Sequence, residues 1–400
     1  MSAYLDAIKK RENSLLCHTY GRYPIAIERG KGTRLYDFDG KEYVDLLAGI
    51  AVVNLGHCRD DLNGVMAEQA TRLVHVSNLF YQEPQLDLAE KLLATCHAGK
   101  VFFCNSGAEA NEAAIKLARR YMRMVRGREA YEIVTLTSSF HGRTLATLTA
   151  TGQDKVKEGF APLPGGFVTV PWGDLDALRA AVGPQTAAIM VEAVQGEGGV
   201  RPLTLEYAQG LAALCAERDV LLICDEVQAG MGRTGKFWAF EHFGLKPDIF
   251  SAAKALANGL PMGAMLCTDE VAKGFVPGAH ATTFGGGPVV AAVAAAVVDI
   301  IHEEKLVDQA WALGDYALGL FHQVRDSYPG KVADVRGMGL LLGVELDVDD
   351  PQAVWQGLLD RGFILNLAQG TTLRLVPPLT ITKDDLDAFA AALREVLADA

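Results

Sequence analysis

The sequence predicts an α/β protein with a mostly parallel central sheet in a large domain and a smaller α+β domain formed by both chain ends. Three observations support this. Short apolar runs broken by turns come first, apolar β-rich runs alternating with helical stretches follow, and an alanine-rich helical region leads to further strands. At 400 residues the chain exceeds one compact core. We expect residues 1–59 and 291–400 to form the small domain and residues 60–290 the large domain.

The N-terminal part of the small domain is expected to consist of short strands. Residues 24–54 contain two turn signals, Arg29-Gly30 and Asp39-Gly40. Turns at these two places would divide the segment into strands of ordinary length.

The large domain is expected to contain buried parallel strands. Its clearest apolar runs are Val101–Cys104, Ile133–Leu136, Ala187–Val191 and Val220–Cys224, and helical stretches separate them. Unbroken apolar strands joined by helices are typical of a parallel sheet that is buried on both faces.

The C-terminal part is expected to be mixed. An alanine-rich helical region begins at Val289, and strands follow near Leu340–Leu346 and Thr372–Val376. A last helix begins at Thr382 and has one apolar face, formed by Leu386, Phe389, Leu393 and Val396.

Charge and hydropathy exclude several classes of protein. Lys and Arg number 37 against 49 Asp and Glu, a net charge of -12, which disfavours long-range attraction to nucleic acid or anionic membranes. The longest uncharged stretch, Phe275–Val298, is interrupted by glycines and prolines and leaves too short an apolar run to span a bilayer. Residues Met1–Lys10 lack the apolar core of a signal peptide, so we expect a cytoplasmic protein.

The seven cysteines predict neither disulfides nor a metal site. They are odd in number and scattered, with no C-x-x-C pair and no His at ligand spacing. We expect buried free thiols.

A candidate phosphate-binding turn is Asn105-Ser106-Gly107-Ala108-Glu109. It follows an apolar run and opens a helix whose expected apolar face is Ile115, Ala118, Tyr121 and Met122. Ser106 and Glu109 have capping-box spacing, and free N–H groups at a helix start suit a phosphate. An ordinary capped helix would have the same sequence.

Two acids, Asp225 and Glu226, follow the apolar run that ends at Cys224. Ligands of α/β proteins bind at the carboxyl ends of the strands. A buried carboxylate there requires a cationic partner, so we expect a positive group to face it. The alternative is an Asp that caps the next turn.

The segment Gly230–Gly235 matches G-x-G-x-x-G, the pattern of dinucleotide-binding proteins. The first glycine does not end a strand, and no helix is expected to start there. We therefore expect a loop, and keep a nicotinamide-binding protein as the hypothesis from a different class.

Lys254 lies in the apolar run Phe250–Ala257, among small residues. Desolvation lowers the pKa of a lysine toward the neutral, nucleophilic amine. The alternative is a lysine that extends along its helix to solvent, although its small neighbours would cover its stem poorly.

Arg143, in Phe140-His-Gly-Arg143, and Arg374 each lie beside apolar or aromatic residues, and Glu197 lies in the glycine-rich Gln195–Gly199. Two arginines suggest a ligand with carboxylates. Surface salt bridges are the alternative for either arginine.

Taken together, these motifs resemble the fold-type-I, class III aminotransferases over nearly the whole chain. The segments that carry the resemblance are Tyr20–Ile25, Asp45–Ala51, Asn54–His57, His75–Tyr81, Asn105–Asn111, Phe140–Thr144, Asp225–Gln228, Lys254 and Thr282–Gly286. Each is weak alone, and their order makes the combination specific.

The resemblance implies pyridoxal 5'-phosphate as cofactor. Lys254 would hold it and carry the proton during amino transfer, and Asp225 would keep its pyridine nitrogen protonated. Phe140 and Val227 would enclose the ring, and Gln228 would reach its phenolic oxygen.

The resemblance also implies that Ser106, Gly107 and Ala108 bind the phosphate. Thr283 of the partner subunit would complete that site, so we expect a homodimer with shared active sites. No metal is expected.

The implied substrate-binding residues are Arg143, Arg374, Glu197, Asn78 and Tyr20. Arg143 would hold the carboxylate far from the reacting carbon, and Arg374 the one beside it. Glu197 would mask Arg374 when no carboxylate is present.

The substrate implied by the resemblance is N-acetylornithine, with 2-oxoglutarate as acceptor, in arginine biosynthesis. His75–Tyr81 resembles that branch, and ornithine-specific members carry an aromatic residue where Ile50 stands. Ornithine, succinylornithine and N-succinyl-diaminopimelate stay open as donors.

Three positions depart from the family pattern: Gly287 replaces Asn, Ala193 replaces Pro, and Arg59-Asp60 replaces His-Pro. None removes an expected catalytic group.

Overall fold

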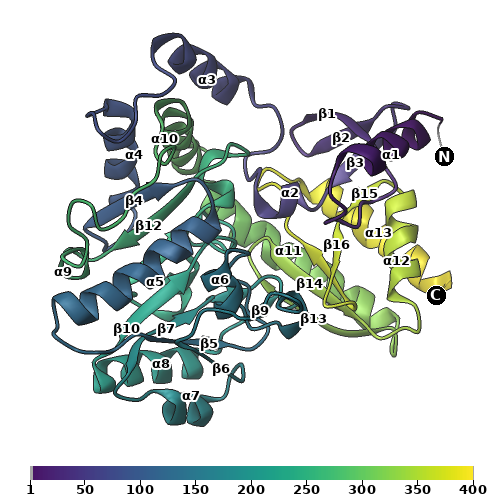
Figure 1. Ribbon diagram of the computed structural model, residues 1–400. Helices are drawn as coiled ribbons and strands as arrows, with labels where there is room; N and C mark the ends of the chain where they lie inside the picture. Colours follow the sequence, from purple (N-terminus) through teal and green to yellow (C-terminus); the bar gives the residue numbers. More distant parts are fainter. Residues whose placement is uncertain (1–2, 400) are drawn as a thin grey trace.

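The computed structural model describes residues 3–399 (Figure 1). Met1, Ser2 and Ala400, at the outer ends of the predicted ranges 1–59 and 291–400, lie outside the described residues. A seven-stranded sheet forms the centre, in the order β4-β12-β11-β10-β7-β5-β6. Its strands are β4 (Lys100–Cys104), β5 (Glu132–Leu136), β6 (Phe167–Val170), β7 (Thr186–Val191), β10 (Leu221–Asp225), β11 (Ile249–Ala252) and β12 (Gly263–Cys267).

This sheet is mostly parallel, as predicted. Strand β10 is parallel to β7 and β11, and β5 is parallel to β6 and β7. Strand β12 is antiparallel to both of its neighbours, so the predicted strand Val101–Cys104 lies in an antiparallel pair and not in a parallel one. The reason is the short connection from β11 to β12, which returns the chain as an antiparallel neighbour.

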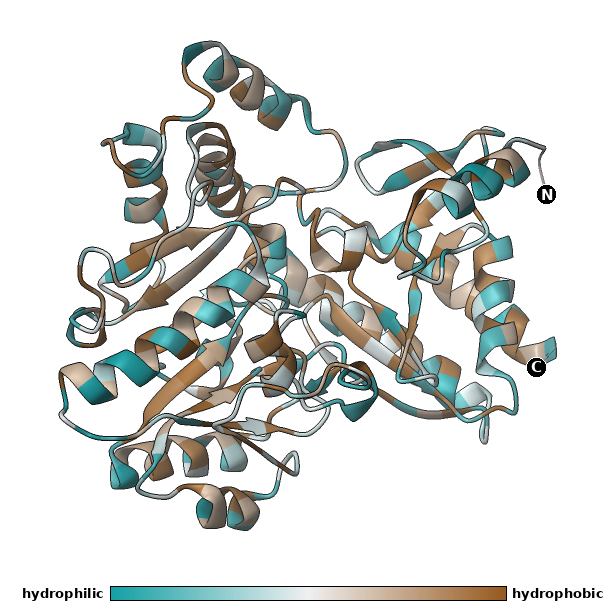
Figure 2. Ribbon diagram, in the orientation of Figure 1, coloured by the Kyte–Doolittle hydropathy of each residue, from teal (hydrophilic) through white to brown (hydrophobic). Residues whose placement is uncertain are grey.

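Helices bury both faces of the central sheet. Helix α5 (Gly107–Met124) covers one face, and its predicted apolar residues Ile115, Ala118, Tyr121 and Met122 are all buried. Helix α8 (Leu205–Arg218) covers the other face. Alternate residues of β10 follow this division, since Ile223 packs in the cluster of α5 and Leu222 in that of α8. In Figure 2 the strands are hydrophobic and the outer side of α5 is hydrophilic.

Further helices surround this sheet. They are α3 (Asp60–Arg72), α4 (Glu83–Leu93), α6 (Leu145–Ala150), α7 (Leu175–Ala181), α9 (Asp269–Ala272) and α10 (Pro288–Glu303), with 3-10 turns at Asp154–Val156, Ala239–Phe243 and Lys254–Ala257. Helix α10 contains the predicted alanine-rich region and packs against α3 and α4.

The N-terminal segment forms a small sheet of β1 (Ile27–Lys31), β2 (Arg34–Asp37) and β3 (Glu42–Asp45), joined by β15 (Phe363–Ile364). The predicted turn at Asp39-Gly40 is present, with Gly40 at φ 82°. The turn predicted at Arg29-Gly30 is wrong, because Gly30 lies inside β1 and the chain turns at Gly32, φ 56°. Gly30 serves a close approach instead, since a Cβ there would lie 2.9 Å from the Cβ of His57.

The C-terminal segment forms a second sheet in the order β13-β14-β17-β16. Its strands are β13 (Val332–Met338), β14 (Leu341–Leu346), β16 (Asn366–Ala368) and β17 (Thr372–Leu375). Two of them match the predicted strands near Leu340–Leu346 and Thr372–Val376. Its helices are α11 (Leu306–Ser327), α12 (Pro351–Asp360) and α13 (Lys383–Asp399).

The last helix has the predicted start and apolar face. The hydroxyl of Thr382 accepts a hydrogen bond from the backbone N–H of Asp385, and the four predicted apolar residues are buried.

The two chain ends meet, because β15 from the C-terminal part pairs in parallel with β3. Helix α1 (Ala3–Leu15) and the short α2 (Ala48–Ala51) complete the N-terminal part. The domain boundaries near residues 59 and 290 stay a prediction.

The cysteines are all free, but not all are buried. Cys17 and Cys58 are exposed, so the expectation of buried thiols is wrong for these two. Cys96 is half-buried, and the other four cysteines are buried as expected. Cys17 follows the surface helix α1, and Cys58 lies in the turn that precedes α3. Within residues 3–399, every helix is too short or too polar to cross a membrane.

Candidate active site

A cavity of about 400 Å³ lies where β10 ends and α5 begins. The predicted residues that line it are Ser106, Gly107, Ala108, Phe140, Arg143, Glu197, Asp225, Val227, Gln228 and Lys254. A larger hollow of about 750 Å³ between α3, α4 and α10 contains no predicted site residue. Size alone therefore does not identify the site, and the chemistry of the lining favours the smaller cavity.

Lys254 lies just after β11, at the start of a 3-10 turn, with φ 43°. This left-handed conformation is unusual for lysine and typical of functional sites. Burial lowers the pKa of its amine, while the negative charges of Glu197 and Asp225 oppose that shift. The result is an amine closer to its neutral, nucleophilic form.

Asp225 ends β10 and is 3% exposed. Its Oδ2 accepts hydrogen bonds from Nδ2 of Asn111 and pairs with Nδ1 of His141, both at 2.7 Å. The group that pairs directly with this acid, where a positive group was expected, is therefore a histidine. Asn111 and His141 were not predicted as site residues, although both lie in segments that carry the family resemblance, Asn105–Asn111 and Phe140–Thr144.

His141 is fully enclosed. Burial works to lower its pKa, but the hydrogen bond and charge of Asp225 and the charge of Glu192 raise it overall. Glu192, also buried, accepts a hydrogen bond from the backbone N–H of Phe140 at 3.1 Å, and burial raises its pKa to about 7. His141 thus stays positive over a wider pH range beside Asp225.

Glu226 has a structural role. It accepts hydrogen bonds from the backbone N–H groups of Ala239 at 2.6 Å and Phe240 at 2.9 Å, and burial raises its pKa to about 8. It caps the turn that follows and does not line the cavity.

The turn predicted to bind phosphate opens α5, as expected. Ser106 is the N-cap, and its hydroxyl accepts from the N–H of Glu109 at 3.2 Å. The other half of the predicted capping box is absent, because Glu109 accepts from the N–H of Asn105 and not from that of Ser106. Gly107 permits the close packing, since a Cβ there would lie 2.6 Å from Val227.

Arg374 is 1% exposed, and two of its three side-chain partners line the cavity. Its Nη1 donates to Glu197 at 2.6 Å and to Oε1 of Gln228 at 3.0 Å, and its Nε donates to Asn366 at 3.0 Å. Burial would raise the pKa of Glu197, but Arg374 and Lys254 hold it below its ordinary value. Glu197 therefore carries its charge and neutralises Arg374.

Tyr23, which was not predicted, also lies near this pair. The pKa of its hydroxyl is raised overall. Burial is the main cause, the charge of Arg374 opposes the shift, and the charge of Glu197 adds to it. Its ring packs 4.7 Å from that of Trp355.

Arg143 differs from Arg374 in its surroundings. Its side chain is exposed at the edge of the cavity, 5.5 Å from the ring centre of Phe140, and it has no ion pair within residues 3–399. Arg374 is thus covered by Glu197, whereas the guanidinium of Arg143 is exposed.

Four predicted residues do not line the cavity of this subunit. Arg374 lies behind its wall and contacts the lining residues Glu197 and Gln228, and the other three lie farther from them. Thr283 is exposed, Asn78 donates to the backbone oxygens of Thr282 and Gly285, and Tyr20 is 75% exposed beside Arg22. Their roles in binding stay predictions.

Gly230–Gly235 forms a buried loop, as expected, and no helix begins there. Arg233 within it is fully buried and donates to the backbone oxygens of Leu340 and Pro377. The dinucleotide-binding geometry, a glycine turn at a helix start, is absent at this loop.

Residues 16–397 match the family model described as aminotransferase class-III. An acetylornithine aminotransferase of Myxococcus xanthus is 48% identical over 96% of this chain and 95% of the relative, and one of Methanocaldococcus jannaschii is 45% identical over 95% of both. The crystal structure of an ornithine aminotransferase from Toxoplasma gondii matches with a TM-score of 0.95 at 30% identity, covering 99% of this chain and 95% of the other.

Proposed function

Because this chain belongs to the class III aminotransferase family, we propose that it transfers the terminal amino group of N-acetylornithine to 2-oxoglutarate. The products are N-acetylglutamate semialdehyde and glutamate, in a step of arginine biosynthesis. The observation that carries the proposal is that relatives named for this activity are 43% to 48% identical over nearly the whole chain.

The enzyme is a pyridoxal phosphate-dependent aminotransferase, and the cavity fits this cofactor. The free N–H groups at the start of α5 suit the phosphate, the apolar Phe140 and Val227 suit a flat ring, and Asp225 suits a protonated pyridine nitrogen. Pyridoxal phosphate, when bound, supplies the carbonyl carbon that accepts the amino group of the donor.

We infer that Lys254 holds the cofactor and then moves the proton at the reacting carbon. A desolvated amine suits both tasks, because its lowered pKa favours the neutral, nucleophilic form, and that form can take up and return a proton. Asp225, fixed by His141 and Asn111, would hold the proton on the ring nitrogen.

We infer that the two arginines divide substrate binding. N-acetylornithine reacts at an amine remote from its carboxylate, so the open Arg143 would bind that carboxylate. 2-Oxoglutarate reacts beside a carboxylate, which would displace Glu197 and bind Arg374, while Arg143 binds its distal carboxylate.

We also propose a homodimer with shared active sites. Support comes from exposed apolar side chains near Thr283. Phe284, next to it, is 66% exposed, and Leu79 and Phe80 are 85% and 64% exposed. These two lie in the loop between α3 and α4, where Asn78 donates to the backbone oxygen of Thr282. Exposed apolar residues gathered in this way mark protein interfaces. A cytoplasmic location stays a prediction.

A panel of amino donors with 2-oxoglutarate tests the substrate. N-acetylornithine should give the highest kcat/KM, above ornithine, succinylornithine and N-succinyl-diaminopimelate. A higher value for one of the other donors would contradict the proposal. A visible absorbance band of the purified protein would separate this enzyme from a nicotinamide-binding protein, which has none.

A further inference from the structure

The loop that carries Glu197 is fixed to the C-terminal sheet through its backbone. It connects β8 (Val194–Gln195) to β9 (Arg201–Pro202). Arg336, on β13, donates to the backbone oxygen of Gly199 at 2.7 and 2.9 Å and to that of Val200 at 3.0 Å. Hydrogen bonds from one charged donor group to two adjacent carbonyls fix the position of a backbone firmly.

Arg336 and Arg374 belong to one row across this sheet. Arg336 pairs with Gly343 on β14, and Gly343 pairs with Arg374 on β17. Paired residues project from the same face, so both arginines face the loop. One binds the side chain of Glu197 and the other binds the backbone that follows it.

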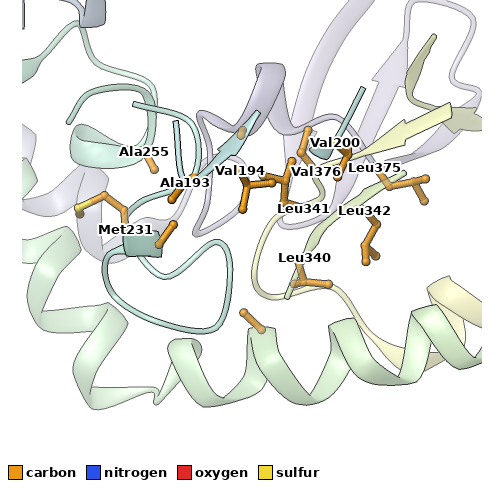
Figure 3. Close-up of a cluster of buried hydrophobic side chains, with 14 of the residues drawn as sticks. Ala193, Val194, Val200, Met231, Ala255, Leu340, Leu341, Leu342, Leu375 and Val376 are labelled. Atoms are coloured by element: carbon orange, nitrogen blue, oxygen red, sulfur yellow. The ribbon is translucent and has the colours of Figure 1, made fainter. Parts of the chain in front are cut away.

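Gly343 leaves the space into which the loop fits. A Cβ at this position would lie 3.0 Å from the Cβ of Val200, so a larger residue would push the loop away from the sheet. Val194 and Val200, at the two ends of the loop, belong to the buried cluster drawn in Figure 3, with Leu341 and Val376.

The backbone conformation of this loop is unfavourable at one residue. Val200 has φ 55°, a left-handed conformation that is unfavourable for a β-branched residue. The guanidinium that holds it is itself oriented by Asp334 at 2.9 Å and by Glu345. Gln369 holds the other end of this segment, since its Nε2 donates to the backbone oxygen of Glu197 at 2.7 Å. Arg336 fixes the backbone at Gly199 and Val200.

We propose that Arg336, with Gly343, is a positioning residue for donor discrimination. It fixes the loop backbone so that the Glu197 carboxylate covers Arg374, and only that side chain moves when a substrate carboxylate replaces it. This rests on the proposed function, in which Arg374 serves the substrate whose carboxylate adjoins the reacting carbon. If the loop shifts, Arg374 is unmasked, which favours glutamate and leaves N-acetylornithine largely unaffected.

The test uses the holoenzyme and single-turnover half-reactions with glutamate and with N-acetylornithine. Arg336→Gln should raise the ratio of kcat/KM for glutamate over N-acetylornithine about fivefold or more, in the same direction as Glu197→Ala. Arg336→Lys, which keeps the charge and one donor group, should show a smaller rise. Arg59→Gln is the matched control, because Arg59 also binds two carboxylates, Asp61 and Glu304, but lies away from the cavity.

The double variant Glu197→Ala with Arg336→Gln separates positioning from general damage. Its ratio should equal that of Glu197→Ala alone, because the effect of Arg336 passes through Glu197. Equal losses with both donors in Arg336→Gln, or a further change of the ratio in the double variant, would overturn the inference. Failure of the proposed function is distinguishable, since the wild-type enzyme would then react with glutamate and not with N-acetylornithine.

Discussion

The buried guanidinium of Arg374 donates to the carboxylate of Glu197 at 2.6 Å, while Arg143 across the cavity has no ion pair within residues 3–399. A largely desolvated charge that loses its partner costs several kcal/mol. In the proposed division of roles, Arg374 would therefore accept a substrate carboxylate only in exchange for Glu197, and this exchange would control which substrate reacts.

Removal of Glu197 should change the preference between donors. Glu197→Ala leaves Arg374 uncovered, so it should raise the reactivity of glutamate as donor far more than that of N-acetylornithine. Single-turnover rates of each half-reaction measure this.

The two arginines should differ in the same assay. Arg374→Ala should damage the 2-oxoglutarate half-reaction selectively, and Arg143→Ala should damage both half-reactions. Equal losses in both half-reactions for Arg374→Ala would disprove the division of roles.

Lys254 should be the residue that carries the cofactor. Borohydride reduction followed by peptide mapping should find the pyridoxyl group on this residue, because its amine is desolvated and lines the cavity. Lys254→Ala should keep part of its cofactor through the phosphate-binding turn and lose amino transfer. Label on another lysine would refute the assignment.

His141 should couple stability and activity to pH through Asp225. His141→Leu removes a hydrogen bond to a charged group, worth about 1.5–3 kcal/mol, so kcat should fall roughly 10- to 100-fold. The pKa of His141 is raised on folding, so its contribution to stability is complete below the unfolded pKa and is lost as pH rises through the folded pKa. Urea unfolding across this pH range should show a smaller loss of stability in the variant, and an unchanged slope would argue against a charged His141.

The sequence alone predicts much of this site because its motifs are local. A turn after a strand, an acid at a strand end and a lysine in an apolar run are each set by neighbouring residues, and the fold brings them to one cavity. His141 and Glu192 could not be assigned in this way. Their roles depend on contacts with Asp225 and with the backbone of Phe140, far away in sequence.

The same limit explains the wrong turn at Arg29-Gly30. Glycine is favoured in turns and also where two segments approach closely, and only the position of His57 shows that Gly30 serves the second purpose. Similarly, Val101–Cys104 has the composition of a parallel strand, but its partner β12 fixes an antiparallel pair.

Exposed apolar residues near Thr283 should hold two subunits together. Leu79→Asp should shift the protein toward monomer in sedimentation velocity, because it would place a charge in the proposed interface, at a side chain that is 85% exposed in the single subunit. Leu205→Asp, at a residue 55% exposed on α8, is the control and should leave the assembly unchanged.

Thr283→Ala should keep the dimer and weaken cofactor retention by roughly 1.5–3 kcal/mol. An active wild-type monomer at assay concentration would contradict the shared sites.

Two glycines in α11 should respond in opposite ways to the same substitution. Alanine normally stabilises a helix interior by about 1 kcal/mol relative to glycine, and at Gly319 nothing lies within 4 Å of the added Cβ. At Gly314 the added Cβ would lie 2.1 Å from the backbone oxygen of Gly339. Gly339 is itself closely packed, since a Cβ on it would lie 2.4 Å from the carbonyl carbon of Thr234, so its backbone has little room to move. Overpacking of this kind costs about 1–3 kcal/mol and exceeds the gain in helix propensity. The thermal midpoint of the holoenzyme should therefore rise for Gly319→Ala and fall for Gly314→Ala; a rise for both would show that α11 is not packed against Gly339.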